Sequence, residues 1–404
     1  MRLTTMVLAS TFRSHSSLAL SAFSICAAFV LGLPAVSSAE WIVELPQQDR
    51  QAIVTLLRAG QFAQLDQRYE AFQHQYENGQ INDRDITLLY QAFYDTSPEN
   101  EAYLNQWVAE NPKSYPARLA RGIYYASVGG KKRGGKWAQE TPDEQMIELS
   151  NFLDLSNRDV VDSLFLTAKP IVSLLQLLKS SQHRDGKLSN RNWLNYANRI
   201  DPTNYGARRR YMATLTPRWG GSYDEMWKFF KECSGQNLPS EHLRVFESQI
   251  YLDQAKTFAE RNQRDTALPL YRKALGLLNG IDNTERLDAL KGVVYNGSRT
   301  TNLEDFSQEI DETLRLAPQE SRILSYRAWI RFKHGRFEEG LKDYSMAAEL
   351  GDDYSQFQFG KQLYYGVPPT LIPNQQQGLT WIKKSAEQGH EAAQRFLEQL
   401  GLKQ

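Results

Sequence analysis

The chain consists of segments with the apolar spacing of helices, and this pattern constrains its fold more than any other feature. Apolar residues recur at helical intervals over stretches of roughly 12 to 20 residues, which Pro, Gly, Asn or Asp interrupts. The alternation of Val, Ile and Thr with polar residues that marks strands is scarce. The sequence therefore predicts an all-α protein.

Small residues recur at the positions where two antiparallel helices would touch. Residues 321–354 contain Leu324, Ala328, Gly335, Phe337, Gly340, Tyr344, Ala347 and Leu350. Small side chains let helices approach closely while aromatic side chains fill the gaps. This window resembles the tetratricopeptide repeat, a helix-turn-helix unit of about 34 residues. Residues 248–281 resemble it as well, and 287–320 form a degenerate copy after a longer turn expected at 282–286.

The last part of the chain resembles the related Sel1-like repeat. Its landmarks are Gly360, Gly366, Asn374, Gly378 and the run from Trp381 to Gly389. Asn374 stands where the family expects Asp, and Gly378 where it expects Ala, at a cost of about 1 kcal/mol in helix propensity. Residues 367–373 contain three prolines and are expected to form a rigid loop.

Residues 60–235 also read as helix pairs, with less regular spacing. Their landmarks are the stretches 111–118, 133–135, 201–202 and 215–222. They resemble the bacterial family called domain of unknown function 4034, whose members join such a segment to repeats. The resemblance implies a helical fold and no activity.

The expected architecture is an α-solenoid of stacked antiparallel helix pairs, with tetratricopeptide-like and Sel1-like repeats after a less regular helical part. The expected divisions are a signal peptide at 1–39, the irregular domain at 40–240, tetratricopeptide-like repeats at 241–350, and a Sel1-like repeat with a C-terminal cap at 351–404.

Three helix starts carry a capping box, in which Ser or Thr accepts from an orphan amide and Glu three residues later reaches back. These starts are 141–144, 222–225 and 301–304. In the first, Pro142 is expected at the first helical position.

The first 39 residues read as a signal peptide. Arg2 and Arg13 precede an apolar run at 18–33, and Ser37-Ser38-Ala39 offers small residues for cleavage by a signal peptidase. Cleavage after Ala39 predicts a periplasmic or secreted protein. The alternative is an uncleaved inner-membrane anchor, since the apolar run approaches the roughly 20 residues that span a bilayer.

The charge balance excludes some partners. The chain has 47 basic and 47 acidic residues, and removal of Arg2 and Arg13 would leave 45 basic residues against 47 acidic. Bulk binding to nucleic acid or to anionic membranes needs a sustained basic face, so neither is expected unless the N-terminal run anchors the chain. Cys233 would be the single cysteine left, so no intrachain disulfide can form.

Four residues are candidates for binding a partner. Residues 130–136 have the spacing of a phosphate-binding loop, but Trp137 stands where Ser or Thr should hold magnesium and no strand precedes them, which favours a solvated basic turn. In a second interpretation Arg133 and Lys136 hold a carboxylate or phosphate of a partner.

Arg218 and Trp219 complete this set of candidates. Residues 219–222 begin a helix whose amides could attract an anion, or they form a tight turn in which Trp219 is buried and Ser222 caps the helix. Arg208 to Arg210 spread over different faces of one helix, so they do not predict a basic stripe.

No catalytic residues, metal or cofactor are expected. The histidines His74, His183, His242, His334 and His390 lack ligand spacing. Ser222 lacks a nucleophile elbow, and Cys233 reads as a small buried hydrophobe.

Two classes of function stay open. The first is a scaffold of the cell envelope that binds a protein or peptide in a groove lined by Asn, Arg, Lys and Tyr. The second is an enzyme or small-molecule binder with a site in the N-terminal helical part.

Overall fold

The chain divides into two units, residues 1–40 and 41–404. The computed structural model describes residues 45–134, 141–181, 187–281, 283–299 and 302–402. The expected signal peptide lies outside these residues, as do Lys136, His183 and Thr301. The internal divisions near 240 and 350 stay predictions.

Regular structure in the described residues is helical, which confirms the predicted all-α class. It comprises 19 α-helices and three short 3-10 helices, and one isolated β-bridge joins Val367 to Leu371. None of the helices in this part of the chain combines the length and apolar character that a bilayer-spanning segment needs.

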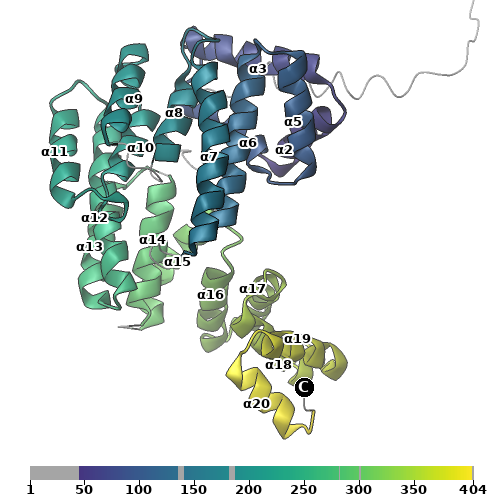
Figure 1. The fold of residues 1–404 in the computed structure, drawn as a ribbon. Helices are drawn as coiled ribbons and strands as arrows, with labels where there is room; N and C mark the ends of the chain where they lie inside the picture. Colours follow the sequence, from purple (N-terminus) through teal and green to yellow (C-terminus); the bar gives the residue numbers. More distant parts are fainter. Residues whose placement is uncertain (1–44, 135–140, 182–186, 282, 300–301, 403–404) are drawn as a thin grey trace, which may run out of the picture. The chain divides into compact units, whose positions relative to one another are not determined.

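The N-terminal elements are packed mainly against their neighbours in sequence, with α6 against α7 and α8 against both α9 and α10 (Figure 1). They are α2 Gln47–Arg58, α3 Phe62–Glu77, α4 Asp83–Leu89, η1 Tyr90–Tyr94, α5 Glu99–Glu110, α6 Tyr115–Arg133, α7 Asp143–Ser163, α8 Ile171–Ser180, α9 Lys187–Ile200, α10 Gly206–Thr214, η4 Pro217–Trp219 and α11 Tyr223–Ser234.

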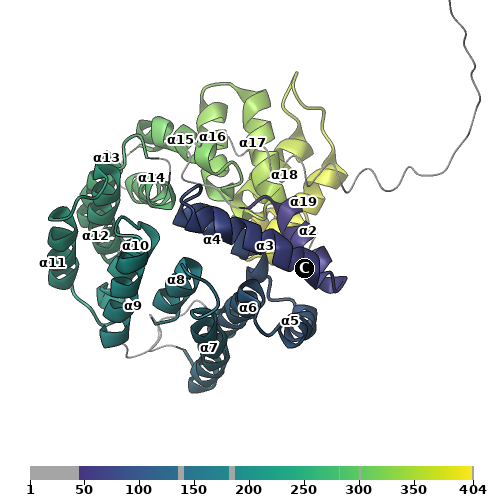
Figure 2. The same ribbon diagram turned by 90° about the horizontal axis from the view of Figure 1, so that it is seen from above.

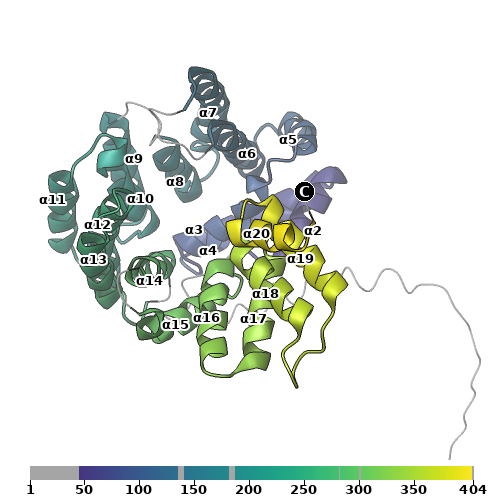
Figure 3. The same cartoon turned by 90° about the horizontal axis from the view of Figure 1, so that it is seen from below.

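The C-terminal elements form the expected helix pairs. They are α12 Ser240–Glu260, α13 Arg264–Leu277, α14 Thr284–Gly297, η5 Leu303–Phe306, α15 Ser307–Leu316, α16 Ser321–Lys333, α17 Phe337–Glu349, α18 Asp353–Tyr365, α19 Gln375–Glu387 and α20 Glu391–Gln399. Packing is most extensive within the pairs α12–α13, α16–α17 and α18–α19. Helices α16 and α17 lie next to each other in the views from above and from below (Figures 2 and 3).

Small residues lie at the contacts between paired helices, as their spacing predicted. The alanines at these contacts are completely buried: Ala255, Ala267, Ala274, Ala328 and Ala347. Gly360 of α18 faces Gly378 of α19, and a Cβ on Gly378 would lie only 2.7 Å from the carbonyl oxygen of Gly360. The departure of Gly378 from the family pattern therefore has a steric reason, since the two backbones meet there.

Aromatic side chains fill the core between the helices. Tyr124, Tyr125, Phe229 and Tyr344 are buried, whereas Trp227 and Phe230 are partly exposed at its edge. Trp107, Tyr69, Tyr90, Phe246 and Phe306 are among the largest side chains that are fully enclosed.

One predicted helix start is confirmed, and three predicted boundaries need correction. Ser222 caps α11 as expected, accepting from the Glu225 amide at 3.2 Å. Pro142 is the N-cap of α7 rather than its first helical residue, because its ψ of 142° is extended. Asn302, not Thr301, caps η5. The turn expected at 282–286 lies earlier in the chain, between Leu277 at the end of α13 and Thr284 at the start of α14.

Two further segments were predicted as turns or loops. Residues 367–373 form the expected loop between α18 and α19, closed by the pair of backbone hydrogen bonds that join Val367 and Leu371. The solvated basic turn predicted at 130–136 is wrong for its first part, since Gly130 to Arg133 form the last turn of α6. Basic side chains are favourable at that end of a helix because they face the negative end of its dipole.

We expect Gly378→Ala to destabilise the C-terminal repeats by about 2 kcal/mol, because the added methyl group would collide with the backbone of α18. This outweighs a gain of at most about 1 kcal/mol in helix propensity. Urea unfolding followed by circular dichroism would measure the loss. Gly276→Ala is the matched control, since that helical glycine has no neighbour within 4 Å, and equal effects of both variants would contradict the steric explanation.

Candidate functional site

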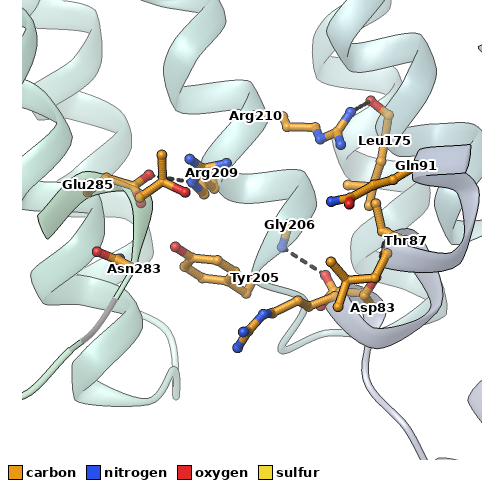
Figure 4. Close-up of a pocket in the computed structure, with 13 residues that line it drawn as sticks. Asp83, Thr87, Gln91, Leu175, Tyr205, Gly206, Arg209, Arg210, Asn283 and Glu285 are labelled. Carbon is orange, nitrogen blue, oxygen red and sulfur yellow. Dashed lines mark hydrogen bonds and ion pairs between the residues drawn. The ribbon is translucent and has the colours of Figure 1, made fainter. Parts of the chain in front are cut away.

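A polar cavity of about 200 Å³ lies where four separate stretches of the chain meet. Figure 4 shows its walls, which come from the start of α4, η1, α8, the start of α10 and the start of α14. The lining residues are Asp83, Arg84, Thr87, Leu88, Gln91, Leu175, Tyr205, Gly206, Arg209, Arg210, Asn283, Thr284 and Glu285.

The start of α10 approaches α4 closely because its first residue is a glycine. The amide of Gly206 donates to the Asp83 carboxylate at 2.8 Å, and a Cβ on Gly206 would lie 2.9 Å from the same oxygen and 3.2 Å from Leu175. Asp83 is buried, and burial raises its pKa although the Gly206 hydrogen bond works in the opposite direction. Asp83 thus joins two helices that are 123 residues apart in the chain.

Arg209 and Glu285 form an ion pair across the cavity, between α10 and the first turn of α14 (Figure 4). The Glu285 side chain is only 6% exposed, whereas that of Arg209 is 35% exposed. The carboxylate also accepts from Gln249 at 3.4 Å. Glu285 raises the pKa of Arg209 further above its usual value, because the two opposite charges attract each other.

Arg210 points to another wall of the same cavity. One of its guanidinium nitrogens donates to the Leu175 carbonyl oxygen at 2.7 Å (Figure 4). Burial lowers its pKa, yet an arginine stays protonated at neutral pH. Among the described residues no carboxylate lies within ion-pair distance of Arg210.

Asn283 adds a buried amide to the cavity wall beside Tyr205. Its side-chain oxygen caps α14 by accepting from the Arg286 amide at 2.8 Å, and the side chain is almost completely enclosed. Its side-chain nitrogen has no hydrogen-bond partner in the described part of the chain. Tyr205 is held by a stacked contact with Phe246, with ring centroids 5.8 Å apart.

A second, more open cavity of about 380 Å³ lies along α12, α13 and α14. It is lined by Lys256, Ala259, Glu260, Arg264, Tyr271, Asp288, Lys291, Gly292, Tyr295, Asn296 and Arg299. We call it the repeat groove. Its residue types are those that the sequence predicted for a peptide-binding groove.

The lysines of the repeat groove are fixed by carboxylates, and two of its arginines are not. Lys256 pairs with Asp288 and Lys291 with Glu320, each at 2.7 Å. Arg264 and Arg299 have no carboxylate within ion-pair distance in the described residues. The repeat groove therefore presents positive charge that its own side chains leave uncompensated.

The sequence-predicted binding residues lie outside both cavities as far as the structure describes them. Arg133 ends α6 and donates to the Gly134 carbonyl oxygen at 3.2 Å, and Arg218 pairs with Glu260 on the surface at 3.1 Å. Trp219 ends η4 and is partly exposed rather than buried, while Gly220 supplies the expected positive φ of 77°. The binding roles of Arg133, Arg218 and Trp219 stay predictions, as does that of Lys136.

Sequence reasoning missed the residues of the first cavity. Arg208, Arg209 and Arg210 point in different directions, as predicted. Because of this, Arg209 and Arg210 reach two walls of one cavity, whereas Arg208 contacts Asn204 and Gln236. No local motif marks this set, because its members meet only through tertiary packing.

Other reactive side chains show no grouping in the described residues. No set of three His, Cys, Asp or Glu side chains could hold a metal ion there. Cys233 is completely buried, and burial raises its pKa to about 11, which suits the inert apolar role predicted for it.

Comparison with known proteins identifies the N-terminal half. The family model described as Domain of unknown function (DUF4034) matches residues 49–183 and 164–247. Residues 49–247 thus carry this domain, as their resemblance to the family implied. No curated protein matches the chain.

Solved structures of other helical proteins are similar at low identity. Yeast Tom70 is 13% identical over 75% of this chain and 60% of that chain, with a TM-score of 0.37. The apo form of the quorum sensor NprR from B. thuringiensis is 13% identical over 88% of this chain and 98% of that chain, with a TM-score of 0.33. The chain therefore spans less than two thirds of the length of Tom70.

We expect Arg209→Ala to destabilise the protein by about 1–3 kcal/mol, because it leaves the buried Glu285 carboxylate with Gln249 as its remaining partner. The partial exposure of Arg209 keeps the loss below that of a fully buried pair. Arg395→Ala, which removes an exposed pair with Glu391 at 3.6 Å, should cost no more than about 0.5 kcal/mol. Urea unfolding of both variants measures the difference, and equal losses would show that the Arg209–Glu285 pair contributes no more than a surface contact.

Proposed function

We propose that the chain is a protein-binding scaffold of the cell envelope, which holds an extended acidic segment of its partner in the repeat groove. The observation that carries this proposal is the uncompensated charge of Arg264 and Arg299 in a groove that is also lined by tyrosine and asparagine. Stacked helix pairs commonly present such concave surfaces to peptides.

The polar residues of the repeat groove suit a peptide backbone. Asn296 donates from its side-chain nitrogen to the Gly292 carbonyl oxygen at 2.7 Å, which leaves its own oxygen to accept a peptide N–H. Burial raises the pKa of Tyr271 and of Tyr295 to about 12, so both hydroxyl groups keep their protons and can donate. A groove of this size accommodates a few side chains of a ligand.

The pairs within the repeat groove prepare it for binding. Lys256 and Asp288 connect α12 to α14, and Lys291 and Glu320 connect α14 to the segment that follows α15. Because these pairs already fix the walls, less conformational entropy is lost when a peptide binds. Arginine is also well suited to carboxylates, since its planar group donates two parallel hydrogen bonds.

Binding to this groove predicts a preference for acidic peptides. Fluorescence polarisation should show that a labelled dodecamer of alternating Glu and Leu binds the full chain, that the matching Lys and Leu dodecamer does not, and that binding weakens as NaCl rises from about 50 to 300 mM. The double variant Arg264→Glu and Arg299→Glu should lower the affinity at least about tenfold, because it reverses the charge of the groove.

The control for this experiment has the same change in net charge. Lys228→Glu with Lys342→Glu reverses two exposed lysines of α11 and α17 that line neither cavity. This variant should bind the acidic dodecamer like the unaltered chain. An equal loss in both double variants, or equal binding of both dodecamers, would contradict a specific groove.

Export is the second part of the proposal. It is supported by the sequence of the first 39 residues, in which Arg2 and Arg13 precede an apolar run at 18–33 and Ser37-Ser38-Ala39 follows it. The intact mass of the protein recovered from its native cell envelope should correspond to a chain that begins at Glu40. A mass corresponding to a chain that begins at Met1 would rule out cleavage and favour the inner-membrane anchor.

The other class of function, an enzyme or small-molecule binder in the N-terminal helical part, has a possible location in the cavity between α4, α10 and α14. Its described lining contains the carboxylates Asp83 and Glu285 and the hydroxyl groups of Thr87, Thr284 and Tyr205.

A further inference from the structure

We propose that the cavity between α4, α10 and α14 binds a small organic anion, with a carboxylate or a phosphate as the recognised group. This site is separate from the repeat groove, and the proposal does not depend on peptide binding.

The first argument is a buried donor that lacks an acceptor. The side-chain nitrogen of Asn283 lies in the cavity wall beside Tyr205. Burial raises the pKa of the Tyr205 hydroxyl and Asn283 is close enough to lower it, yet no atom of the described residues accepts a hydrogen bond of normal geometry from this nitrogen. An unpaired buried donor costs about 1–3 kcal/mol, and such groups usually have a partner. Its oxygen is committed to the cap of α14, so the side chain cannot turn over without losing that bond. An acceptor from a ligand would satisfy it.

Two further donors face the same space. Arg210 uses one nitrogen for the Leu175 carbonyl oxygen and also interacts with Tyr94. The negative charge of Asp83 acts on it from a distance, but no described carboxylate forms an ion pair with it. Gln91 accepts from the Leu45 amide at 2.9 Å through its oxygen, and its side-chain nitrogen donates to no described residue. Figure 4 places Arg210 and Gln91 on the wall opposite Asn283 and Tyr205.

The two carboxylates of the cavity already accept hydrogen bonds from the protein. Asp83 accepts from Gly206, and Glu285 accepts from Arg209 and Gln249. The groups left for a ligand therefore include the Arg210 guanidinium and the side-chain nitrogens of Asn283 and Gln91, which are all donors and favour an anion over a cation.

The volume limits the size of the ligand. About 200 Å³ is less than the roughly 300–1,000 Å³ of sites for drug-sized molecules, so a small dicarboxylic acid or a three-carbon phosphate ester is the expected size class. A carboxylate and a phosphate offer the same acceptor oxygens to Arg210, Asn283 and Gln91. The experiment has to distinguish them.

Isothermal titration of the full chain with succinate, glycerol 3-phosphate and inorganic phosphate, each against NaCl at equal ionic strength, tests the proposal. We expect saturable binding of at least one probe. Binding of succinate alone would identify a carboxylate ligand, and binding of the phosphates alone a phosphate ligand. If none of the three probes binds above the salt control, the cavity holds solvent only and the proposal is wrong.

Two substitutions then locate the site. Asn283→Asp and Gln91→Glu each keep the oxygen that accepts a backbone hydrogen bond and replace the free donor by a negative charge. Each should weaken anion binding at least tenfold. Asn374→Asp makes the same change at an exposed N-cap of α19 and should bind like the unaltered chain.

The two variants also protect the test against misfolding. Asn283→Asp acts at a buried position, whereas Gln91→Glu acts at a partly exposed one, and circular dichroism reports whether each is folded. If either folded variant binds the probe with unchanged affinity, the anion lies elsewhere and the cavity is not its site.

Discussion

The fold depends on the closeness with which neighbouring helices meet, and small residues set that distance. Gly292 lies against the ring of Tyr271, Gly297 against Phe306 and Gly340 against Phe332, so that any side chain at these glycines would displace an aromatic ring. A helix pair of this type cannot bury its apolar face alone and is stabilised by the next pair in the stack. Both cavities follow from this packing, since α14 is held against α13 by the contact of Tyr271 with Gly292 and its polar face is left to line them.

Buried charge pairs complement the apolar contacts between successive helices. Asp159 of α7 accepts two hydrogen bonds of 2.7 Å from Arg121 of α6, and Asp343 of α17 is held by Arg327 and Arg331 of α16. A buried pair of this kind gives little net stability, because desolvation offsets most of the attraction. It penalises any other register of the two helices, however, since a shift would leave a carboxylate buried without its partner.

The sequence revealed the local features of the structure and not its sites. Helix positions followed from apolar spacing, and Ser222 was recognisable as a cap because that interaction spans three residues. Pro142 and Thr284 show the limit of such rules, since α7 begins one residue later and α14 three residues earlier than predicted. The assignment of the last helices to the Sel1-like family stays a prediction, although the Gly360–Gly378 contact explains its least typical residue.

The first cavity could not be predicted because its residues have no relation along the chain. Asp83, Arg210 and Asn283 lie in segments more than seventy residues apart, and each has an ordinary local role as a helix-terminal carboxylate, a basic helical residue or an N-cap. The residues of the repeat groove were predictable by type, since Asn, Arg, Lys and Tyr recur on α12 to α14. Which of these arginines lacked a carboxylate became visible only in three dimensions.

A single helix borders both cavities. The first turn of α14 supplies Asn283 and Glu285 to one, and its next turns supply Asp288, Lys291 and Asn296 to the other. A helix moves as a rigid rod, so an occupant that tilts or restrains α14 at its start changes the spacing of side chains ten to fifteen ångströms along its axis. Thermodynamic linkage then requires that two such occupants alter each other's affinity by the same factor. A ligand bound by the family domain would thus change the affinity of the repeats for their own ligand through one shared helix, α14.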